Sequence, residues 1–334
     1  MTKRILTGAL IAALTGTGAL AADFELKISH MFPSTHFIQT LALEPWTKAI
    51  EERSGGRVKF TIFAAGSALG DASRQFDQVR SGVVDIAIGI PAIPRGRHPR
   101  TTLIELPFTV ANATAGTKAL MEIHEKYLKE DFPGTVVLSL TTTEPSAIHT
   151  KTPVTDLNQL KGMRVRAPTP SVTAMLEAMG ATPVGMPPTQ IYENLERGVI
   201  EGNVMPWGPV GAFKLHEVLK NHINARVDVV AMYTLMNENR YRALPPDIRK
   251  IFDEMSGEYF TTRWSRWWGE TDQIAIDAAK KAGNTIVNMP DAQREEWRQK
   301  MKPVVDRFVE EQGKAISNSR QIYDAMVAAL KKHE

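Results

Sequence analysis

The stretch that decides the fold is DLNQLKGMRVRAPTPSVTAMLEAMGATPVGMPPTQIYENLERGVIEGNVMPW, residues 156–207. Within it, residues 163–166 read as a short strand that ends on Arg166, and the prolines that follow stop this strand before a helix over residues 171–179. Strands of an open α/β sheet present their carboxyl ends to the crevice where ligands bind. Arg166 is therefore predicted to face such a crevice, where its planar guanidinium is suited to holding a carboxylate through two hydrogen bonds.

Similar strand-like runs recur on both sides of this stretch, with helix-like runs between them. They lie at residues 25–29, 57–63, 84–88, 136–140, 182–185 and 199–204. Alternation of strands and helices predicts parallel sheets covered by helices, which is an α/β fold. A chain of roughly 310 residues exceeds the size at which one core keeps growing. We therefore expect two lobes, each a mostly parallel sheet flanked by helices.

The last third of the chain has a helical pattern. Residues 247–281 form one run with weak breaks at Gly257 and Gly269. A helix of that length would be about 50 Å long, enough to span both lobes. Its three tryptophans share helical spacing, which favours core packing over a sugar-binding platform: Trp264, Trp267 and Trp268. Further helices are predicted over residues 292–312 and 316–333.

The chain is expected to pass between the lobes more than once. A helix containing His216 is predicted after Trp207, and near residues 233–237 the chain is expected to return to the first lobe. The expected division gives lobe I residues 22–143 and about 229–270. Lobe II would then hold residues 144–228 and about 271–334, with the ligand cleft between the lobes.

The amino-terminal residues have the pattern of an export signal. Lys3 and Arg4 precede an apolar run over residues 5–20, and Ala19-Leu20-Ala21 fits a cleavage site. This predicts a periplasmic protein whose mature chain starts at Ala22. The alternative is a membrane anchor, but a run of about 16 residues is short for a membrane span.

Charge and cysteine content narrow the function classes. Of 40 basic side chains, 38 remain without Lys3 and Arg4, against 37 acidic ones. Such a balanced surface predicts no nucleic-acid partner. The absence of cysteine excludes disulfides, thiolate metal sites and a cysteine nucleophile.

Eight short segments, each weak alone, occur in an order that carries a family resemblance. They are residues 51–58, 66–71, 81–85, 105–108, 160–168, 180–183, 200–202 and 244–249. Through them the chain resembles the periplasmic solute-binding subunits of tripartite ATP-independent periplasmic (TRAP) transporters, of the dicarboxylate-receptor type. The resemblance implies two lobes joined by crossing strands, a lobe-spanning helix, and a ligand, usually an organic acid, enclosed by hinge closure. It also implies a membrane permease of a small and a large subunit as partner.

The same resemblance assigns the carboxylate-binding arginine of the family to Arg166 and leaves Arg164 on the other strand face. Relatives that bind sialic acid carry an arginine where this chain has Ser146 and an asparagine where it has Met205. Sialic acid is therefore not the expected ligand. Met205 and Trp207 instead predict an apolar or aromatic wall that can stack on a ring or a sugar face.

Further ligand contacts are predicted at strand ends and on loops that face the cleft of the implied fold. They are Thr142, Thr143, His36, Phe32, Ile90, Pro91 and Tyr192. Other interpretations stay open: Arg166 as an ion-pair partner that ties loops together, Trp207 as a core residue, and Tyr192 as a helix residue packed near Arg166. Keto acids, sugar acids, aromatic acids and C4 dicarboxylates all remain open as ligands.

Catalytic patterns are weak. His216, Glu217 and His222 resemble a zinc-protease helix, but the second histidine is six residues on rather than four. Neither a nucleophile elbow, a phosphate-binding loop nor a dinucleotide fingerprint occurs. We therefore expect no enzyme, no cofactor and no metal site, although metal-assisted ligand binding stays open. The alternatives to a transport receptor are a receptor for a sensor system and, less expected, a secreted hydrolase of small acids.

Overall fold

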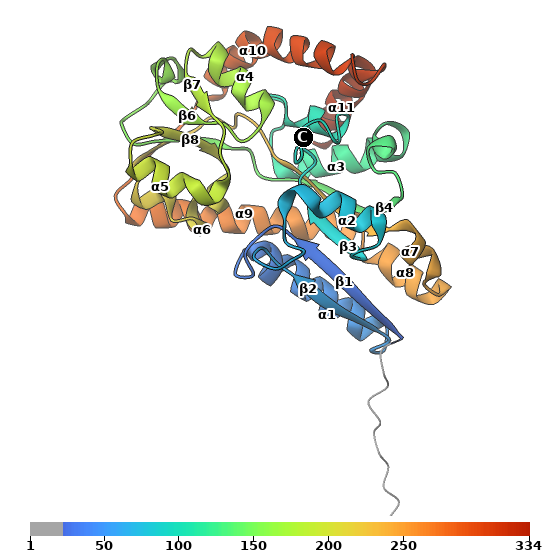
Figure 1. Ribbon diagram of the computed structural model, residues 1–334. Helices are drawn as coiled ribbons and strands as arrows, with labels where there is room; N and C mark the ends of the chain where they lie inside the picture. Colours follow the sequence, from blue (N-terminus) through green and yellow to red (C-terminus); the bar gives the residue numbers. More distant parts are fainter. Residues whose placement is uncertain (1–22) are drawn as a thin grey trace, which may run out of the picture.

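The computed structural model describes residues 23–334 (Figure 1). The predicted signal peptide and its cleavage site lie outside the described residues. No helix within residues 23–334 is long and apolar enough to cross a membrane. The described chain forms two sheets with helices around them, as expected for a two-lobed α/β protein.

The first sheet has five strands in the order β2-β1-β3-β10-β4. Its strands β1 and β2 are parallel, as are β1 and β3, whereas β10 runs antiparallel to both of its neighbours. The four strands predicted here are confirmed, and so is the return of the chain to this sheet as β10. The bounds are β1 Phe24–His30, β2 Val58–Phe63, β3 Ile86–Gly89, β4 Thr135–Thr142 and β10 Ala231–Asn237.

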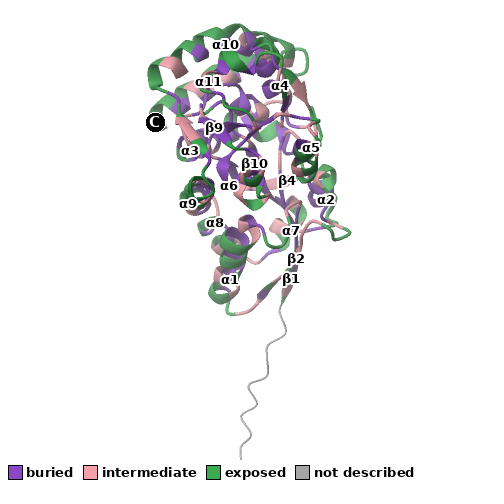
Figure 2. Ribbon diagram, turned by 90° about the vertical axis from the view of Figure 1, so that its left-hand side faces the viewer, coloured by how far each residue is buried: buried purple, intermediate pink, exposed green. Residues whose placement is uncertain are grey.

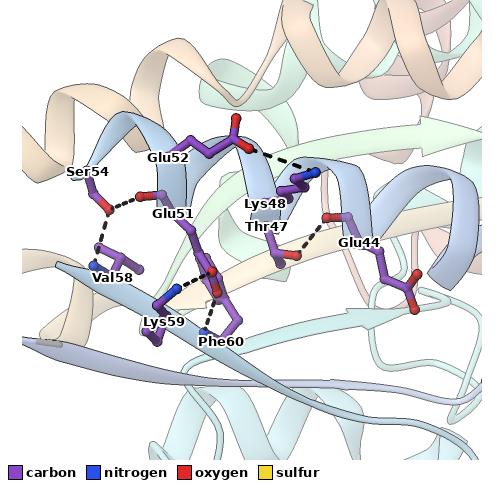
Figure 3. Close-up of polar contacts among 9 residues, drawn as sticks. All are labelled: Glu44, Thr47, Lys48, Glu51, Glu52, Ser54, Val58, Lys59 and Phe60. Atoms are coloured by element: carbon purple, nitrogen blue, oxygen red, sulfur yellow. Dashed lines mark hydrogen bonds and ion pairs between the residues drawn. The ribbon is translucent and has the colours of Figure 1, made fainter. Parts of the chain in front are cut away.

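Helix α1 (Glu44–Arg53) lies against the edge of the first sheet and continues a π-helical turn over Ile38–Leu43. Pro45 sits in the first turn of α1, where its missing N–H costs no hydrogen bond. Glu51 fixes α1 to β2, since its carboxylate accepts from the Lys59 ammonium at 2.7 Å and from the Phe60 N–H at 3.3 Å (Figure 3). The Ser54 hydroxyl accepts from the Val58 N–H at 3.2 Å. Segment 51–58 is thus a helix-to-strand connection.

Two helices lie on the opposite side of the first sheet from α1. Helix α2 (Gln75–Ser81) follows a short 3-10 turn that Asp71 caps by accepting from the Ser73 N–H. Helix α3 (Ala113–Ile123) begins at Asn112, whose side chain accepts from the Ala115 N–H. Both helices contribute to an apolar core on one face of the sheet.

The second sheet has six strands in the order β11-β9-β5-β8-β6-β7. Strand β5 runs antiparallel to β8 and β9, and the other pairs are parallel. The bounds are β5 Ala147–Thr150, β6 Arg164–Arg166, β7 Thr182–Val184, β8 Gly202–Met205, β9 Asn221–Asn224 and β11 Thr285–Asn288.

Three of these strands, β5, β9 and β11, were not predicted from the sequence. The helix expected around His216 was wrong, because α6 (Trp207–Ala212) is short, a 3-10 turn covers Leu215–Glu217, and the chain then enters β9. Strands of four residues carry little periodicity, and β5 and β9 place histidine, threonine and asparagine in the interior. Their polar side chains hide the apolar signal on which strand prediction rests.

The two faces of the second sheet are covered by different helices. Helices α4 (Pro170–Ala178) and α10 (Asp291–Gln312) pack against the apolar side chains of one face. The other face is covered by α5 (Ile191–Glu196), α6 and α9 (Glu258–Lys281). Buried residues gather on the strands, while the outer helices such as α10 carry the exposed ones (Figure 2).

The long helical run predicted after residue 246 divides at one of its two glycines. Helix α8 (Pro246–Glu254) is followed by α9, and Gly257 between them has a φ of 54°, which ends the first helix. Gly269 does not interrupt α9. Helix α9 packs on α6 beside the second sheet and on β4 and α3 beside the first, so it spans both sheets (Figure 1). Its tryptophans lie in the core of the first sheet, which confirms the packing prediction.

Two extended segments cross between the sheets and bond to each other. The Thr143 N–H donates to the Val230 carbonyl at 3.0 Å, and the Ser146 N–H donates to the Asp228 carbonyl at 2.7 Å. The last helix, α11 (Ser319–His333), packs on α3 beside the first sheet. The division of the chain into lobes stays a proposal, and these contacts favour assigning α11 to lobe I rather than to lobe II.

Candidate functional site

Arg166 is the last residue of β6, and its side chain lies across the carboxyl end of the second sheet. Its Nε donates to the Met186 carbonyl and its Nη1 donates to the Val204 carbonyl, both at 3.3 Å. Only 6% of the residue is exposed. Burial lowers the pKa of Arg166 to about 10, against the opposing effect of the Asp228 charge, so the guanidinium stays charged at neutral pH. Arg164 lies two residues before Arg166 on β6, so strand alternation puts both on one face and the expectation of the other face was wrong; its half-exposed side chain lies beside Glu201.

Asp228 and Ser146 lie on the two crossing segments next to Arg166. Asp228 is 4% exposed and Ser146 is fully buried, yet neither carboxylate oxygen nor the hydroxyl has a hydrogen-bond partner among residues 23–334. Burial raises the pKa of Asp228 to about 7, while the nearby Ser146 hydroxyl and the Arg166 charge act in the opposite direction. The hydroxyl is close to the carboxylate without meeting hydrogen-bond geometry.

Asn203 on β8 completes this group, which we call the Arg166 cluster (Arg166, Ser146, Asn203 and Asp228). Asn203 pairs in register with Arg166, and paired residues of neighbouring strands point to the same face of a sheet. The residue is fully buried, and neither end of its amide has a hydrogen-bond partner. Polar groups that are buried in proteins are nearly always bonded, so three open residues beside one arginine mark a site prepared for a polar ligand.

A pair of histidines continues the polar row along the same face. The Nδ1 atoms of His149 and His222 are 2.8 Å apart, and His149 Nε2 lies 2.9 Å from the Met205 carbonyl. The Asn284 amide nitrogen lies 3.1 Å from His222 Nε2. A carbonyl only accepts, so His149 carries its proton on Nε2, and His222 donates from Nδ1 to the bare Nδ1 of His149. The pair thereby holds the end of β8 in place.

Trp207 follows β8 as the first residue of α6 and is 3% exposed. Its Nε1 donates to the Asn224 side chain at 2.6 Å, and its ring contacts those of His149 and His222 at centroid distances of 4.9 and 4.6 Å. It borders a cavity of about 300 Å³ together with Glu144, Arg226 and Asp272. Arg166 is not among the residues that line this cavity, so the structure does not bring the indole and the guanidinium to one cavity wall.

Asp272 ties α9 to this region. Its carboxylate accepts from the Gly208 N–H at 2.6 Å in the first turn of α6. Burial raises the pKa of Asp272 to about 7, and the neighbouring carboxylate of Glu144 adds to the increase. Burial likewise raises the pKa of Glu144.

The remaining predicted contacts lie around the crossing segments and the first sheet. The Thr142 hydroxyl donates to the Ala113 carbonyl at 3.3 Å, and the Thr143 hydroxyl accepts from the Val230 N–H at 3.0 Å. The Thr142 hydroxyl is thus bonded to α3 beside the first sheet, and the Thr143 hydroxyl is bonded between the crossing segments. Met205, at the end of β8, is 5% exposed and packs with Trp207.

On the first sheet, Phe32 and His36 stack with ring centroids 4.7 Å apart beside a partly buried Ile90. Pro91 is buried after β3. Tyr192 on α5 donates its hydroxyl to Glu217 at 3.2 Å. These residues stay proposals as ligand contacts.

Sequence reasoning missed Asn203, Asp228 and Glu105. Burial raises the pKa of Glu105 to about 8, and Asp228 nearby contributes in the same direction; the Glu105 carboxylate accepts from the Ala231 N–H at 2.9 Å. The available signal for Asp228 was a lone acid in the apolar run VDVVAMYTLM. Among residues 23–334 no group of three acidic or histidine side chains is arranged to hold a metal ion.

Comparisons with known proteins agree with this architecture. The model of the family described as bacterial extracellular solute-binding protein, family 7 (DctP) matches residues 28–312. A TRAP solute-binding protein of Rhodoferax ferrireducens, solved with copurified benzoate, is 32% identical, covers 92% of this chain and 98% of its own, and superposes with a TM-score of 0.86.

Two further relatives extend the comparison. A marine metagenome TRAP protein specific for aromatic acids, solved with 3-hydroxybenzoate, is 28% identical, with coverage of 94% and 100% and a TM-score of 0.85. The 2,3-diketo-L-gulonate-binding periplasmic protein YiaO of Escherichia coli is 26% identical, over 86% of this chain and 88% of its own. The family match and the shared two-sheet architecture lead to one conclusion: the chain belongs to family 7 of the bacterial extracellular solute-binding proteins and is a solute-binding receptor of the TRAP type.

Proposed function

We propose that this receptor binds a carboxylic acid with an aromatic or other ring, and that Arg166 holds the carboxylate. The observation that supports this most directly is the position of Arg166 at the carboxyl end of β6, charged and 6% exposed. Within the described part of the chain its guanidinium is bonded only to two carbonyl groups. Carbonyl oxygens do not neutralise a guanidinium, so its charge remains available for an anion.

The ring is inferred from apolar residues predicted to face the cleft and from two relatives. Met205 at the end of β8 and Phe32 and Ile90 beside the first sheet supply apolar surface for a planar group. The relatives that are 32% and 28% identical were solved with benzoate and 3-hydroxybenzoate. An aromatic acid is therefore the first ligand class to test.

Ligand capture is proposed to proceed by hinge closure of the two lobes. The crossing segments and α9 connect the sheets, and the Ser171 hydroxyl of α4 donates to the Glu105 carbonyl of the first lobe at 3.2 Å. Closure around the ligand excludes water and leaves the carboxylate–guanidinium pair largely unscreened. The closed receptor would then deliver its solute to a TRAP permease of a small and a large membrane subunit, after export and cleavage near Ala21.

The test is a thermal-shift screen of residues 22–334 against aromatic acids, sugar acids, keto acids and uncharged analogues, followed by calorimetry of the hits. A ligand at 100 times its Kd adds about 2.7 kcal/mol of stability. Arg166→Ala should weaken binding of an acid by roughly 2–5 kcal/mol, more than about thirtyfold. Arg164→Ala is the matched control, because Arg164 is half exposed on the same strand and should leave binding unchanged.

Normal acid binding by Arg166→Ala would remove this residue as the carboxylate clamp. Stabilisation by neutral compounds alone would overturn the proposed ligand class. The proposed partner is tested by asking whether the receptor copurifies with its permease from membranes when ligand is present and not when it is absent.

A further inference from the structure

We propose that Asp228 reads a second group of the ligand: it accepts a hydrogen bond from a hydroxyl or amino group of the acid whose carboxylate Arg166 holds. The inference rests on the proposed function and adds a specificity residue to it. It predicts a receptor for hydroxy- or amino-substituted carboxylic acids rather than for plain acids or dicarboxylates.

The first argument is the unmet hydrogen-bonding capacity of Asp228. Both of its carboxylate oxygens are buried without a partner, and the Ser146 hydroxyl and the Asn203 amide beside Arg166 are open as well. A buried carboxylate without partners is costly in free energy. A bound solute with a donor group would donate a hydrogen bond to Asp228. The same solute could also form hydrogen bonds with the neighbouring Ser146 hydroxyl and Asn203 amide.

The second argument is the separation of the two charges. Asp228 and Arg166 influence each other electrostatically, yet among the described residues no nitrogen–oxygen contact within 4.0 Å joins them. The pair is thus near enough to serve one small molecule and too far apart to neutralise itself. An acid that carries its donor group away from the carboxylate can bridge the two side chains.

The third argument concerns the sign of the charge on that second group. Glu105 lies near Asp228, and both are buried acids. A second carboxylate on the ligand would raise the pKa of both acids further and would bury two negative charges beside a single arginine, so a C4 dicarboxylate is disfavoured. A hydroxyl or amino group brings a donor and no negative charge. The side chains beside Arg166 therefore favour a ligand whose second group is a neutral or positively charged hydrogen-bond donor.

The experiment measures Kd by calorimetry for acids that differ only in the donor group. The pairs are benzoate with the 2-, 3- and 4-hydroxybenzoates, benzoate with 3-aminobenzoate, and phenylacetate with mandelate; succinate serves as the dicarboxylate. At pH 8, above the Asp228 pKa of about 7, the carboxylate is mostly ionised, and a hydrogen bond to this charged acceptor is expected to strengthen binding of one substituted acid about tenfold or more. The hydroxy and amino members distinguish which donor the site takes.

The same panel is then measured on variants. Asp228→Ala should bring the ratio of the two Kd values in the best pair close to one, with the plain acid affected much less than its substituted partner. Asp228→Asn keeps an oxygen that accepts and should retain part of the preference. Asp277→Ala is the control, because Asp277 is an exposed acid on α9 away from the cluster. Thermal melting confirms that each variant folds.

Each outcome separates this inference from the proposed function. Equal affinity of plain and substituted acids for the wild type, tight succinate binding, or an unchanged ratio in Asp228→Ala would overturn the role of Asp228 while leaving Arg166 as the clamp. If Asp228→Ala does not fold, the role of Asp228 is judged from two other results: the Kd ratios of plain and substituted acids for the wild type, and the same ratios for Asp228→Asn. Loss of every acid in Arg166→Ala supports the clamp independently, and absence of binding by any acid of the panel overturns both proposals.

Discussion

His149 and His222 share one hydrogen bond between their Nδ1 atoms, 2.8 Å apart, inside the second sheet. The bond needs one ring to donate and the other to accept, and His149 also donates to the Met205 carbonyl. Two positive rings cannot form it. Burial lowers the pKa of His149 to about 4 and that of His222 still further, so both histidines are neutral in the folded protein at neutral pH.

This arrangement predicts that acid destabilises the protein. The folded pKa of His149 lies below its ordinary value of 6.5, so its neutral form is favoured by folding and the full stability is present above pH 6.5. Stability should fall as the pH drops from 6.5 toward about 4, by about 1.4 kcal/mol per pH unit for one histidine. The check is urea unfolding of wild type and His149→Gln between pH 7.5 and pH 4.5. The glutamine can donate to Met205 without titrating, so the variant should show the smaller slope.

A His149→Gln variant with an unchanged slope would show that the pair does not carry the acid sensitivity.

Asp272 predicts the opposite pH dependence. Its folded pKa of about 7 lies above the ordinary 3.8, so the folded state retains the proton longer and the stability that depends on it is lost as the pH rises from about 4 to about 7. Asp272→Asn removes the titration and keeps an oxygen that accepts from the Gly208 N–H. Between pH 5 and pH 8, the free energy of unfolding of the variant relative to that of wild type should rise by on the order of 1–3 kcal/mol. Urea unfolding at the two pH values measures this; a difference that is constant with pH would refute it.

Glycine substitutions test the packing of the first sheet. A β-carbon on Gly89 would lie 2.2 Å from the Tyr233 hydroxyl oxygen, so Gly89→Ala forces the buried ring to move and should cost about 1–3 kcal/mol. Gly269 in α9 has no atom within 4 Å of such a carbon, so Gly269→Ala should stabilise by up to about 1 kcal/mol through helix propensity. Thermal melting of the two variants should give shifts of opposite sign.

The Ser171 hydroxyl predicts a measurable effect on closure. It links α4 to the Glu105 carbonyl of the first lobe at 3.2 Å, and Ser171→Ala removes that bond. A neutral hydrogen bond contributes about 1 kcal/mol, so ligand affinity should fall about fivefold while the melting temperature without ligand changes little. Thr173→Ala is the control, since its hydroxyl bonds within α4 to the Thr169 carbonyl. Equal affinities for wild type and Ser171→Ala would mean that this contact does not favour the closed form.

The sequence was sufficient for the parts of the site that depend on local pattern. A strand followed by prolines placed Arg166 at a strand end, and the alternation of strands and helices predicted the α/β architecture of both sheets. Helical spacing identified the tryptophans of α9 as core residues.

The rest of the Arg166 cluster could not be predicted, because long-range contacts assemble it. Ser146 and Asp228 are brought together by two crossing segments 82 residues apart in the chain, and Asn203 meets Arg166 through the pairing of β8 with β6. Strands β5 and β9 were missed for a related reason, since their interior histidines satisfy one another rather than follow an apolar pattern.

The position of β10 has a consequence for how the chain matures. This strand lies between β3 and β4 in the first sheet, although it follows the entire β5–β9 portion of the second sheet in the chain. When the chain emerges from its amino end, β1, β2 and β3 can pair with one another early, but β4 has no neighbour in the sheet until β10 has been made, up to residue 237. The first sheet is therefore completed only after most strands of the second, so the two sheets cannot fold as two consecutive stretches of chain.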